Sequence, residues 1–353
     1  MAYTTIDRPT DYFRTKIYSG TGSNAAITFD ETDNSMQPDL LWGKCRGSGE
    51  TNKRHVLTDS VRGINSQLAS NTDAVETTYT NSFTAFGSNG FSVGDDNGVN
   101  ENSNTFVAWC WKAGTAFTND ASATGIGSID SSGSVNETAG FSIVSYTGSG
   151  SAATVKHGLS TTPNMMIIKN RVTDSKDWQV YSPVNDPTDA LALNQTDATG
   201  DSDVYWNDTA PTSSVFSVKS GATNTSGAAT IGYIFSNRQG YSKFGSYTGN
   251  GNADGPFIYT GFKPAWVMIK QSNGANGWNI YDNKRNTFNV MDKFLLANSN
   301  QAEASYSVID FLSNGIKLRN TASSFNTSGA SYIYMAFAEN PFVTSTSIPT
   351  TAR

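Results

Sequence analysis

Three copies of one strand pair recur along this chain at a fixed spacing, and this repeat constrains the fold more than any other feature. In each copy an apolar strand begins at a proline, and a second apolar strand begins 68 residues later. The pairs start at Pro38 and Phe106, at Pro163 and Ile231, and at Pro264 and Tyr332. A period of about 100 residues is too long for a solenoid and has the size of a small domain. The sequence therefore predicts three related β modules.

A Tyr-(Ser/Thr)-Gly-X-Gly turn precedes each proline strand and begins at Tyr18, Tyr146 and Tyr247. Glycine supplies the positive φ that such tight turns need. Short apolar strands separated by Gly, Ser, Asn and Thr clusters are typical of a sandwich or barrel. Both faces of the strand pair are apolar, which predicts cover on both sides. We expect an all-β fold of three tandem antiparallel β-sandwich-like repeats, jelly-roll or lectin-like, each burying its proline strand and its second strand.

Composition along the chain predicts six segments. They are an N-terminal docking arm (1–16), β repeat one as the anchor (17–113), a Gly/Ser-rich linker (114–140), β repeat two (141–240), β repeat three (241–345) and a C-terminal tail (346–353). No spacer separates repeats two and three, so we expect a fixed pair, with repeat one at a different angle. Repeat one is also divergent, since it holds both cysteines, Cys45 and Cys110. Their spacing leaves open whether they pair.

The overall charge and composition exclude several classes of protein. A net charge of −6 without a basic stripe argues against nucleic-acid binding. Only 15% of residues are charged while 12% are aromatic, which fits an extracellular-facing or virion β protein and not a disordered chain. The first nine residues show no secretory signal, and no apolar run predicts membrane insertion. Three β modules without a catalytic constellation indicate a structural or adhesive protein, and such a protein without an export signal is expected to leave the cell within a virus particle.

Several long motifs resemble a family of marine bacteriophage proteins, from phages of cyanobacteria and other ocean bacteria. The motifs are the opening segment 1–7, His157-Gly158-Leu159 with Pro163 and Ile168-Lys169, Ser246-Tyr247-Thr248-Gly249-Asn250-Gly251, Lys263-Pro264-Ala265-Trp266-Val267-Met268-Ile269-Lys270, and Met335-Ala336-Phe337-Ala338-Glu339-Asn340-Pro341-Phe342. Members of this family are described as tail-fibre or virion structural proteins, and they offer no catalytic residues to carry over.

The resemblance implies a non-enzymatic virion protein that is made in the host cytoplasm. We expect a tail-associated short fibre or spike that contributes to host attachment. By analogy it would be a homotrimer, with other virion proteins and a host surface glycan as partners. The alternatives are a capsid-surface decoration or head fibre, and a polysaccharide-binding or polysaccharide-cleaving module.

Candidate catalytic and metal sites are weak in this sequence. His55 and His157 are its only histidines, which is too few for a histidine metal site, so we expect no metal and no cofactor. Paired carboxylates could serve a glycosidase, but both acidic loops lack a motif and are interpreted as solvated loops. These loops hold Asp95, Asp96 and Glu101, and Asp201, Asp203 and Asp208. Two Asp-X-X-Arg pairs, Asp59/Arg62 and Asp282/Arg285, are expected to be internal salt bridges.

Aromatic residues offer the better functional lead, because sugars stack on exposed aromatic faces. Trp178 and Trp278 recur at matched repeat positions and are expected in the core. Trp206 has no counterpart in the other copies and lies beside Asn207 and Asp208. We therefore expect Trp206 to be an exposed ligand-binding residue, although a subunit interface would explain it equally well.

Overall fold

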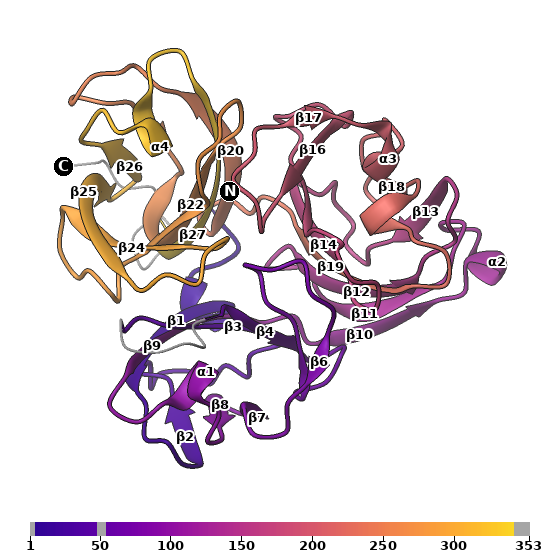
Figure 1. The fold of residues 1–353 in the computed structure, drawn as a ribbon, viewed down its shortest axis with the longest axis horizontal. Helices are drawn as coiled ribbons and strands as arrows, with labels where there is room; N and C mark the ends of the chain where they lie inside the picture. Colours follow the sequence, from indigo (N-terminus) through magenta and orange to yellow (C-terminus); the bar gives the residue numbers. More distant parts are fainter. Residues whose placement is uncertain (1–3, 48–53, 342–353) are drawn as a thin grey trace.

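Three lobes surround a common centre in the computed structural model, which describes residues 4–47 and 54–341 (Figure 1). The lobes follow the three repeats along the chain, and we name them module 1 (β1 to β9), module 2 (β10 to β19) and module 3 (β20 to β27). Strands and short helical turns make up every module, so the all-β prediction is confirmed. The predicted tail, 346–353, lies outside the described residues.

Module 1 is a sandwich of an inner sheet, in the order β1-β9-β3-β4, and an outer sheet, in the order β2-β8-β7. Its elements are η1 (Pro9–Asp11), β1 (Phe13–Ser19), β2 (Ala25–Thr28), β3 (Leu40–Cys45), β4 (Val56–Asp59), β5 (Ser66–Gln67), β6 (Thr77–Thr78), β7 (Phe83–Gly87), β8 (Gly90–Val93), α1 (Asn97–Asn100) and β9 (Thr105–Trp111).

Module 2 has one long sheet, in the order β10-β11-β12-β19-β14-β15-β16-β17, covered by the pair β13-β18. Its elements are β10 (Thr115–Asn119), α2 (Ala121–Thr124), β11 (Ser131–Asn136), β12 (Phe141–Thr147), β13 (Ala153–Lys156), β14 (Met165–Asn170), β15 (Gln179–Tyr181), β16 (Asp189–Ala192), β17 (Gly200–Asp201), α3 (Asp203–Trp206), β18 (Val215–Val218), η2 (Gly221–Thr223) and β19 (Ala229–Phe235).

Module 3 joins its two layers in one eight-stranded sheet, in the order β20-β27-β22-β23-β24-β25-β26-β21. Its elements are β20 (Ser242–Thr248), β21 (Phe257–Tyr259), β22 (Phe262–Gln271), β23 (Asn279–Asp282), β24 (Met291–Leu296), β25 (Ala304–Leu312), β26 (Gly315–Leu318), α4 (Ser323–Asn326) and β27 (Ser331–Pro341). The strands β25, β26 and β21 carry apolar residues that pack on those of β22 and β27.

The proline strand and the second apolar strand are antiparallel neighbours in every module, and both are buried on two sides, as predicted. In module 2, however, the second strand is shifted by one residue relative to modules 1 and 3, although the 68-residue spacing is the same. The central pairs are Trp42 with Trp109, Ile167 with Tyr233, and Met268 with Met335. Since alternate residues face opposite sides of a sheet, Ile231 faces the shared core. Phe106 and Tyr332, its counterparts by spacing, pack in the outer halves of their modules.

One hydrophobic core joins the inner faces of all three modules. At its centre, Trp111, Phe235 and Phe337 form a triangle with ring centroids 5.6–6.4 Å apart. These residues hold equivalent positions on β9, β19 and β27, two residues beyond the central pairs. The modules therefore surround a pseudo-threefold axis. The expectation that repeat one stands apart from a fixed pair of repeats two and three is wrong.

The predicted linker is part of module 2. Its residues form β10, α2 and β11, and β11 pairs with β12 along six residues. Small residues gave this segment the composition of a linker, but they serve packing here: a Cβ on Gly133 would lie 2.8 Å from the ring of Phe117. The boundary between modules 1 and 2 therefore falls near residue 113, at the end of β9.

The predicted docking arm folds onto its own chain. Ile6 lies in the shared core, and the hydroxyl of Thr4 donates to the carbonyl of Gln239 at 2.5 Å. The ring of Tyr12 meets that of Tyr241 edge-on at 5.9 Å. The described part of the arm thus connects module 1 to the start of module 3. Cys45 and Cys110, both buried, do not form a disulfide with each other.

Candidate functional site

The three seams between modules repeat one set of contacts, and they form the most elaborate polar arrangement of the described residues. We name them seam 1/2, seam 2/3 and seam 3/1 after the modules that they join. In each seam a lysine at the end of the proline strand reaches a backbone carbonyl of the neighbouring module. The bonds run from Lys169 to Asp73 (2.8 Å), from Lys270 to Thr196 (3.1 Å) and from Lys44 to Asn300 (3.4 Å). Each module thus holds the preceding one, and the ring closes head to tail.

Burial of these lysines lowers the pKa of Lys169 and of Lys270 to about 8. The desolvation cost of an ammonium is offset where several carbonyl oxygens accept from it. Lys270, for example, also donates to the carbonyls of Gln271 and Gly274. The lysines therefore act as buried connectors between backbone segments.

A ring nitrogen makes a second repeated contact across every seam. Trp178 Nε1 donates to the carbonyl of Ala69 and Trp278 Nε1 to that of Ala192, both at 2.9 Å. Both tryptophans are buried, as predicted. In seam 3/1 the equivalent ring is His55, whose Nε2 lies 2.9 Å from the carbonyl of Leu296.

The hydrogen bonds of His55 require its neutral form. Trp42 Nε1 donates to Nδ1 at 2.8 Å, so Nδ1 accepts and Nε2 carries the proton toward Leu296. Burial, together with the charge of Lys44, holds the pKa of His55 well below its usual value. The ring therefore replaces a tryptophan at this position as a neutral donor.

Two seams carry a buried ion network. In seam 1/2, Arg62 binds Asp59 at 2.5 Å and Glu76 at 2.9 Å, and Arg171 of module 2 binds Glu76 at 2.6 Å. Tyr233 of module 2 donates its hydroxyl to Asp59 at 2.8 Å. Burial raises the pKa of Glu76, but the hydrogen bonds from the two arginines outweigh this and lower it overall.

Seam 3/1 repeats this network with equivalent residues. Arg285 binds Asp282 at 2.5 Å and Glu303 at 3.2 Å, and Arg46 of module 1 binds Glu303 at 2.9 Å. Trp109, the counterpart of Tyr233, donates Nε1 to Asp282 at 3.0 Å. The predicted salt bridges within both Asp-X-X-Arg pairs are therefore present, and each one extends across a seam.

Seam 2/3 lacks both the aspartate and the ring donor of this network. Ser182 stands where the other modules have aspartate, and Met335 stands where they have the tyrosine or tryptophan donor. The backbone contact remains, since Thr199 N donates to the carbonyl of Ser272 at 2.7 Å. The aspartate position is thus uncharged and the donor position is apolar, so neither residue buries a charge that needs a partner.

Trp206, the residue predicted to be an exposed ligand contact, is buried, so this prediction is wrong. Only 1% of its surface is exposed, and its ring meets that of Tyr181 edge-on at 5.6 Å. The short helix α3 places Trp206 against the core of module 2, while Asp203 at its start pairs with Lys219 at the surface. Trp206 is thus buried although Asp203 before it and Asp208 after it are exposed.

Asp96 in the first acidic loop, Asp203 in the second and His157 have structural partners. Asp96 caps α1 by accepting from Gly98 N and pairs with Arg54 at 3.2 Å. His157 is buried, with Nε2 3.2 Å from the carbonyl of Thr212 and Nδ1 accepting from Leu159 N, and burial lowers its pKa to about 4. Within residues 4–47 and 54–341, no three His, Cys, Asp or Glu side chains gather as metal ligands would.

Sequence reasoning missed one buried asparagine in each module. Asn100, Asn224 and Asn326 each hold the Tyr-(Ser/Thr)-Gly-X-Gly turn of their module, accepting from the turn residue after its first glycine and donating to turn carbonyls. That first glycine is needed for close approach: a Cβ on Gly249 would lie 2.2 Å from the carbonyl oxygen of Thr327. The signal was available, because each asparagine comes six or seven residues before the second strand.

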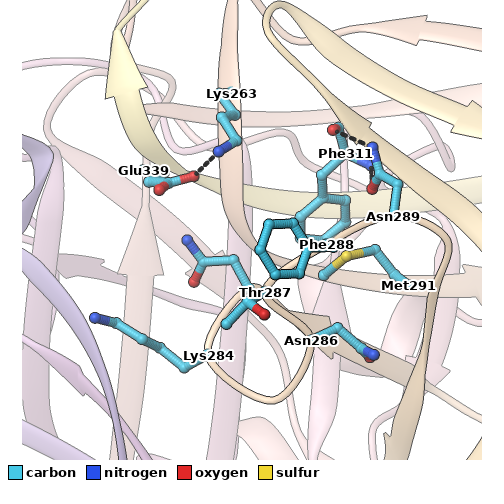
Figure 2. Close-up of a pocket in the computed structure, with 10 residues that line it drawn as sticks. Lys263, Lys284, Asn286, Thr287, Phe288, Asn289, Met291, Phe311 and Glu339 are labelled. Atoms are coloured by element: carbon cyan, nitrogen blue, oxygen red, sulfur yellow. Dashed lines mark hydrogen bonds and ion pairs between the residues drawn. The ribbon is translucent and has the colours of Figure 1, made fainter.

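A pocket of about 400 Å³ opens on module 3, beside the connection from β23 to β24 (Figure 2). Phe288 lies in its middle and is 83% exposed, above the buried Phe311 and Met291. Lys263 and Glu339 form an ion pair of 2.7 Å at the edge of the pocket, and Lys284 lies below Glu339 in this view. No residue of this pocket was singled out from the sequence as a site residue.

No helix in the described part of the chain is both long and apolar enough to span a bilayer. No curated protein and no solved structure matches the chain. A family model does match: it is described as a domain of unknown function (DUF7483) and extends over residues 8–341, from the N-terminal arm to the last strand of module 3. The chain therefore belongs to the DUF7483 family.

Proposed function

We propose that this chain is a non-enzymatic structural protein of a virus particle, a tail-associated short fibre or spike that contributes to host attachment. The observation that carries this proposal is the closed ring of three sandwiches, in which buried charged side chains connect one module to the next. A body of this kind resists local opening, because each module is held by two neighbours and one shared core.

The use of reactive side chains favours a structural role over a catalytic one. General acid–base catalysis needs a titrating group that substrate can reach. His55 and His157 are fully buried and use both ring nitrogens in contacts within the protein. Asp59 and Asp282 are likewise buried and paired with arginines.

The location in a virus particle is supported by the sequence motifs that resemble marine phage tail-fibre and virion proteins. The family match covers all three modules, which supports the whole ring as the functional unit. One chain already supplies three related modules around an axis, so the fibre or spike needs no coiled-coil shaft to hold them together. Light scattering on the purified protein tests the expected homotrimer, and a strict monomer would remove that part of the proposal.

Immunogold labelling of intact particles with an antibody against this chain tests the location. Gold at the tail is the expected result. Gold on the head would replace the tail appendage with a capsid-surface decoration or head fibre. Particles that carry no gold, from a preparation in which the antibody detects the denatured chain in infected cells, would overturn the virion assignment altogether.

A further inference from the structure

Module 3 departs from the other two modules in one hairpin connection. The residue pairs that close this connection are equivalent in the three modules: Leu57 with Leu68, Val180 with Leu191, and Ile280 with Leu295. The third connection is four residues longer than the other two, and the added length lies in the stretch around Phe288. A change confined to one of three otherwise matching elements indicates a role that the seams do not explain.

The longer connection exposes an aromatic ring, and hydrogen bonds brace the connection on both sides of it. Phe288 is 83% exposed, the largest exposed fraction among the large hydrophobic residues described. On one side of it, Asn289 pairs with the backbone of Phe311 through both side-chain atoms at 2.9 Å. On the other side, Asn286 accepts from the backbone of Lys293 at 2.7 Å. The ring is thus presented by a braced loop, which reduces the entropy cost of binding.

Polar groups surround the ring on a surface with balanced charge. Lys263 pairs with Glu339, and Lys284 pairs with Glu31 of module 1 at 3.1 Å. Within the described residues, the side chains of Asn283 and Thr287 make no hydrogen bond, so an amide and a hydroxyl remain available. A second hollow of about 210 Å³ adjoins the pocket and shares Asn283, Lys284 and Glu339 with it.

We propose that this groove on module 3 binds an uncharged glycan, with one sugar ring stacked on Phe288 and its hydroxyls bound by Asn283, Thr287 and the flanking charged pairs. This inference rests on the proposed role in host attachment. The C–H face of a sugar carries slight positive charge and is attracted to the negative face of an aromatic ring. Sugar hydroxyls both donate and accept, which suits amides, lysines and a carboxylate arranged in ion pairs.

The size and charge of the groove favour this class of ligand over others. The two hollows lie within or near the range of ligand sites, and together they extend from Phe288 to the seam with module 1. Each lysine already has a carboxylate partner, so an anionic ligand would have to compete for it. A single exposed phenylalanine ring with polar side chains around it offers little to an apolar peptide, which requires several apolar anchors.

Saturation-transfer difference NMR on the whole protein tests the proposal. The probes are the methyl glycosides of glucose, galactose, mannose and N-acetylglucosamine, together with their linear trisaccharides. We expect saturation transfer to the C–H face of at least one sugar, and about tenfold weaker binding (about 1.4 kcal/mol) in Phe288→Ala. The matched control is Val184→Ala, which changes an exposed residue in the equivalent connection of module 2.

Two results would overturn the glycan site: saturation transfer to none of these sugars, or binding that Phe288→Ala and Val184→Ala leave equally strong. Both substitutions remove exposed side chains, and matching urea unfolding curves would show that neither changes the fold. Failure of this test would leave the proposed function intact if gold labels the tails of particles. Sugar binding without any label on particles would instead support the site and remove the virion role.

Discussion

Seam 3/1 and seam 2/3 solve the same packing problem with different chemistry. Both bring a lysine, a ring nitrogen and a backbone amide to equivalent carbonyls of the neighbouring module. Seam 3/1 adds the buried network of Asp282, Arg285 and Glu303 with Arg46, whereas seam 2/3 has serine and methionine at the key positions. The backbone contacts are therefore sufficient to define the ring, and the ion networks are an addition that two seams carry.

The difference also shows why neighbours in sequence are not the most strongly connected modules. Repeats two and three follow each other without a spacer, yet their seam has no buried ion network among its described residues. Module 1 meets both of its neighbours through such networks. Breaking each type of seam separately would measure what the networks contribute.

Removing Asp282 is expected to give the largest effect. Asp282→Ala leaves Arg285 buried without its closest partner and leaves Trp109 Nε1 without an acceptor. Loss of one member of a buried pair costs about 3–5 kcal/mol in the free energy of unfolding. Urea denaturation followed by tryptophan fluorescence measures this loss.

The matched control for this substitution is Ser182→Ala at the equivalent position of seam 2/3, where no charge is removed and the loss should be about 1 kcal/mol. Equal losses in the two variants would show that the network in seam 3/1 contributes nothing beyond the shared backbone contacts.

Acidification should give the second-largest effect. It should weaken seam 3/1 and not seam 2/3, because only seam 3/1 has a histidine in the ring-nitrogen position. Folding holds the pKa of His55 well below its usual value and that of His157 at about 4. Unfolded histidine titrates near 6.5, so the unfolded chain binds more protons below that pH. The contribution of the neutral histidines to the free energy of unfolding is fully present above pH of about 6.5. It is lost progressively between about 6.5 and 4, by up to about 3 kcal/mol for His157 alone.

Urea midpoints measured from pH 8 to pH 5 test this dependence on the histidines. His157→Asn should remove the part that arises inside module 2, and the part that remains belongs to His55 in seam 3/1. An unchanged midpoint across this range in the unsubstituted protein would contradict the buried neutral state of both rings.

Periodicity predicted the local fold and could not predict how the modules meet. The proline strands and the second strands follow from short apolar runs, and the burial of Trp178 and Trp278 follows from their matched positions in the repeat. The seams depend on contacts between residues far apart, such as Arg171 with Glu76 and Arg46 with Glu303. Their charges look like solvated surface residues when each module is considered alone.

The candidate site was mispredicted for a related reason. Trp206 was selected because it has no counterpart in the other copies and its sequence neighbours are polar, but the exposure of those neighbours does not extend to Trp206, which packs in the core of module 2. Phe288 was overlooked because the extra length of its connection is recognised only when the strand pairs that close the three connections are known. The site lies in the part of module 3 that the repeat does not share.

A double-mutant cycle in seam 2/3 should give the smallest effect and answer the comparison most directly. Ser182→Asp alone buries a carboxylate without a partner, and Met335→Tyr alone brings a hydroxyl against an uncharged neighbour. Together they recreate the contact that Asp59 makes with Tyr233 at 2.8 Å in seam 1/2. We expect the double variant to be more stable than the sum of the two single losses by about 1 kcal/mol, measured by urea denaturation. Strict additivity would mean that the backbone of seam 2/3 holds these two positions too far apart for such a contact, so that geometry excludes the charged pair there.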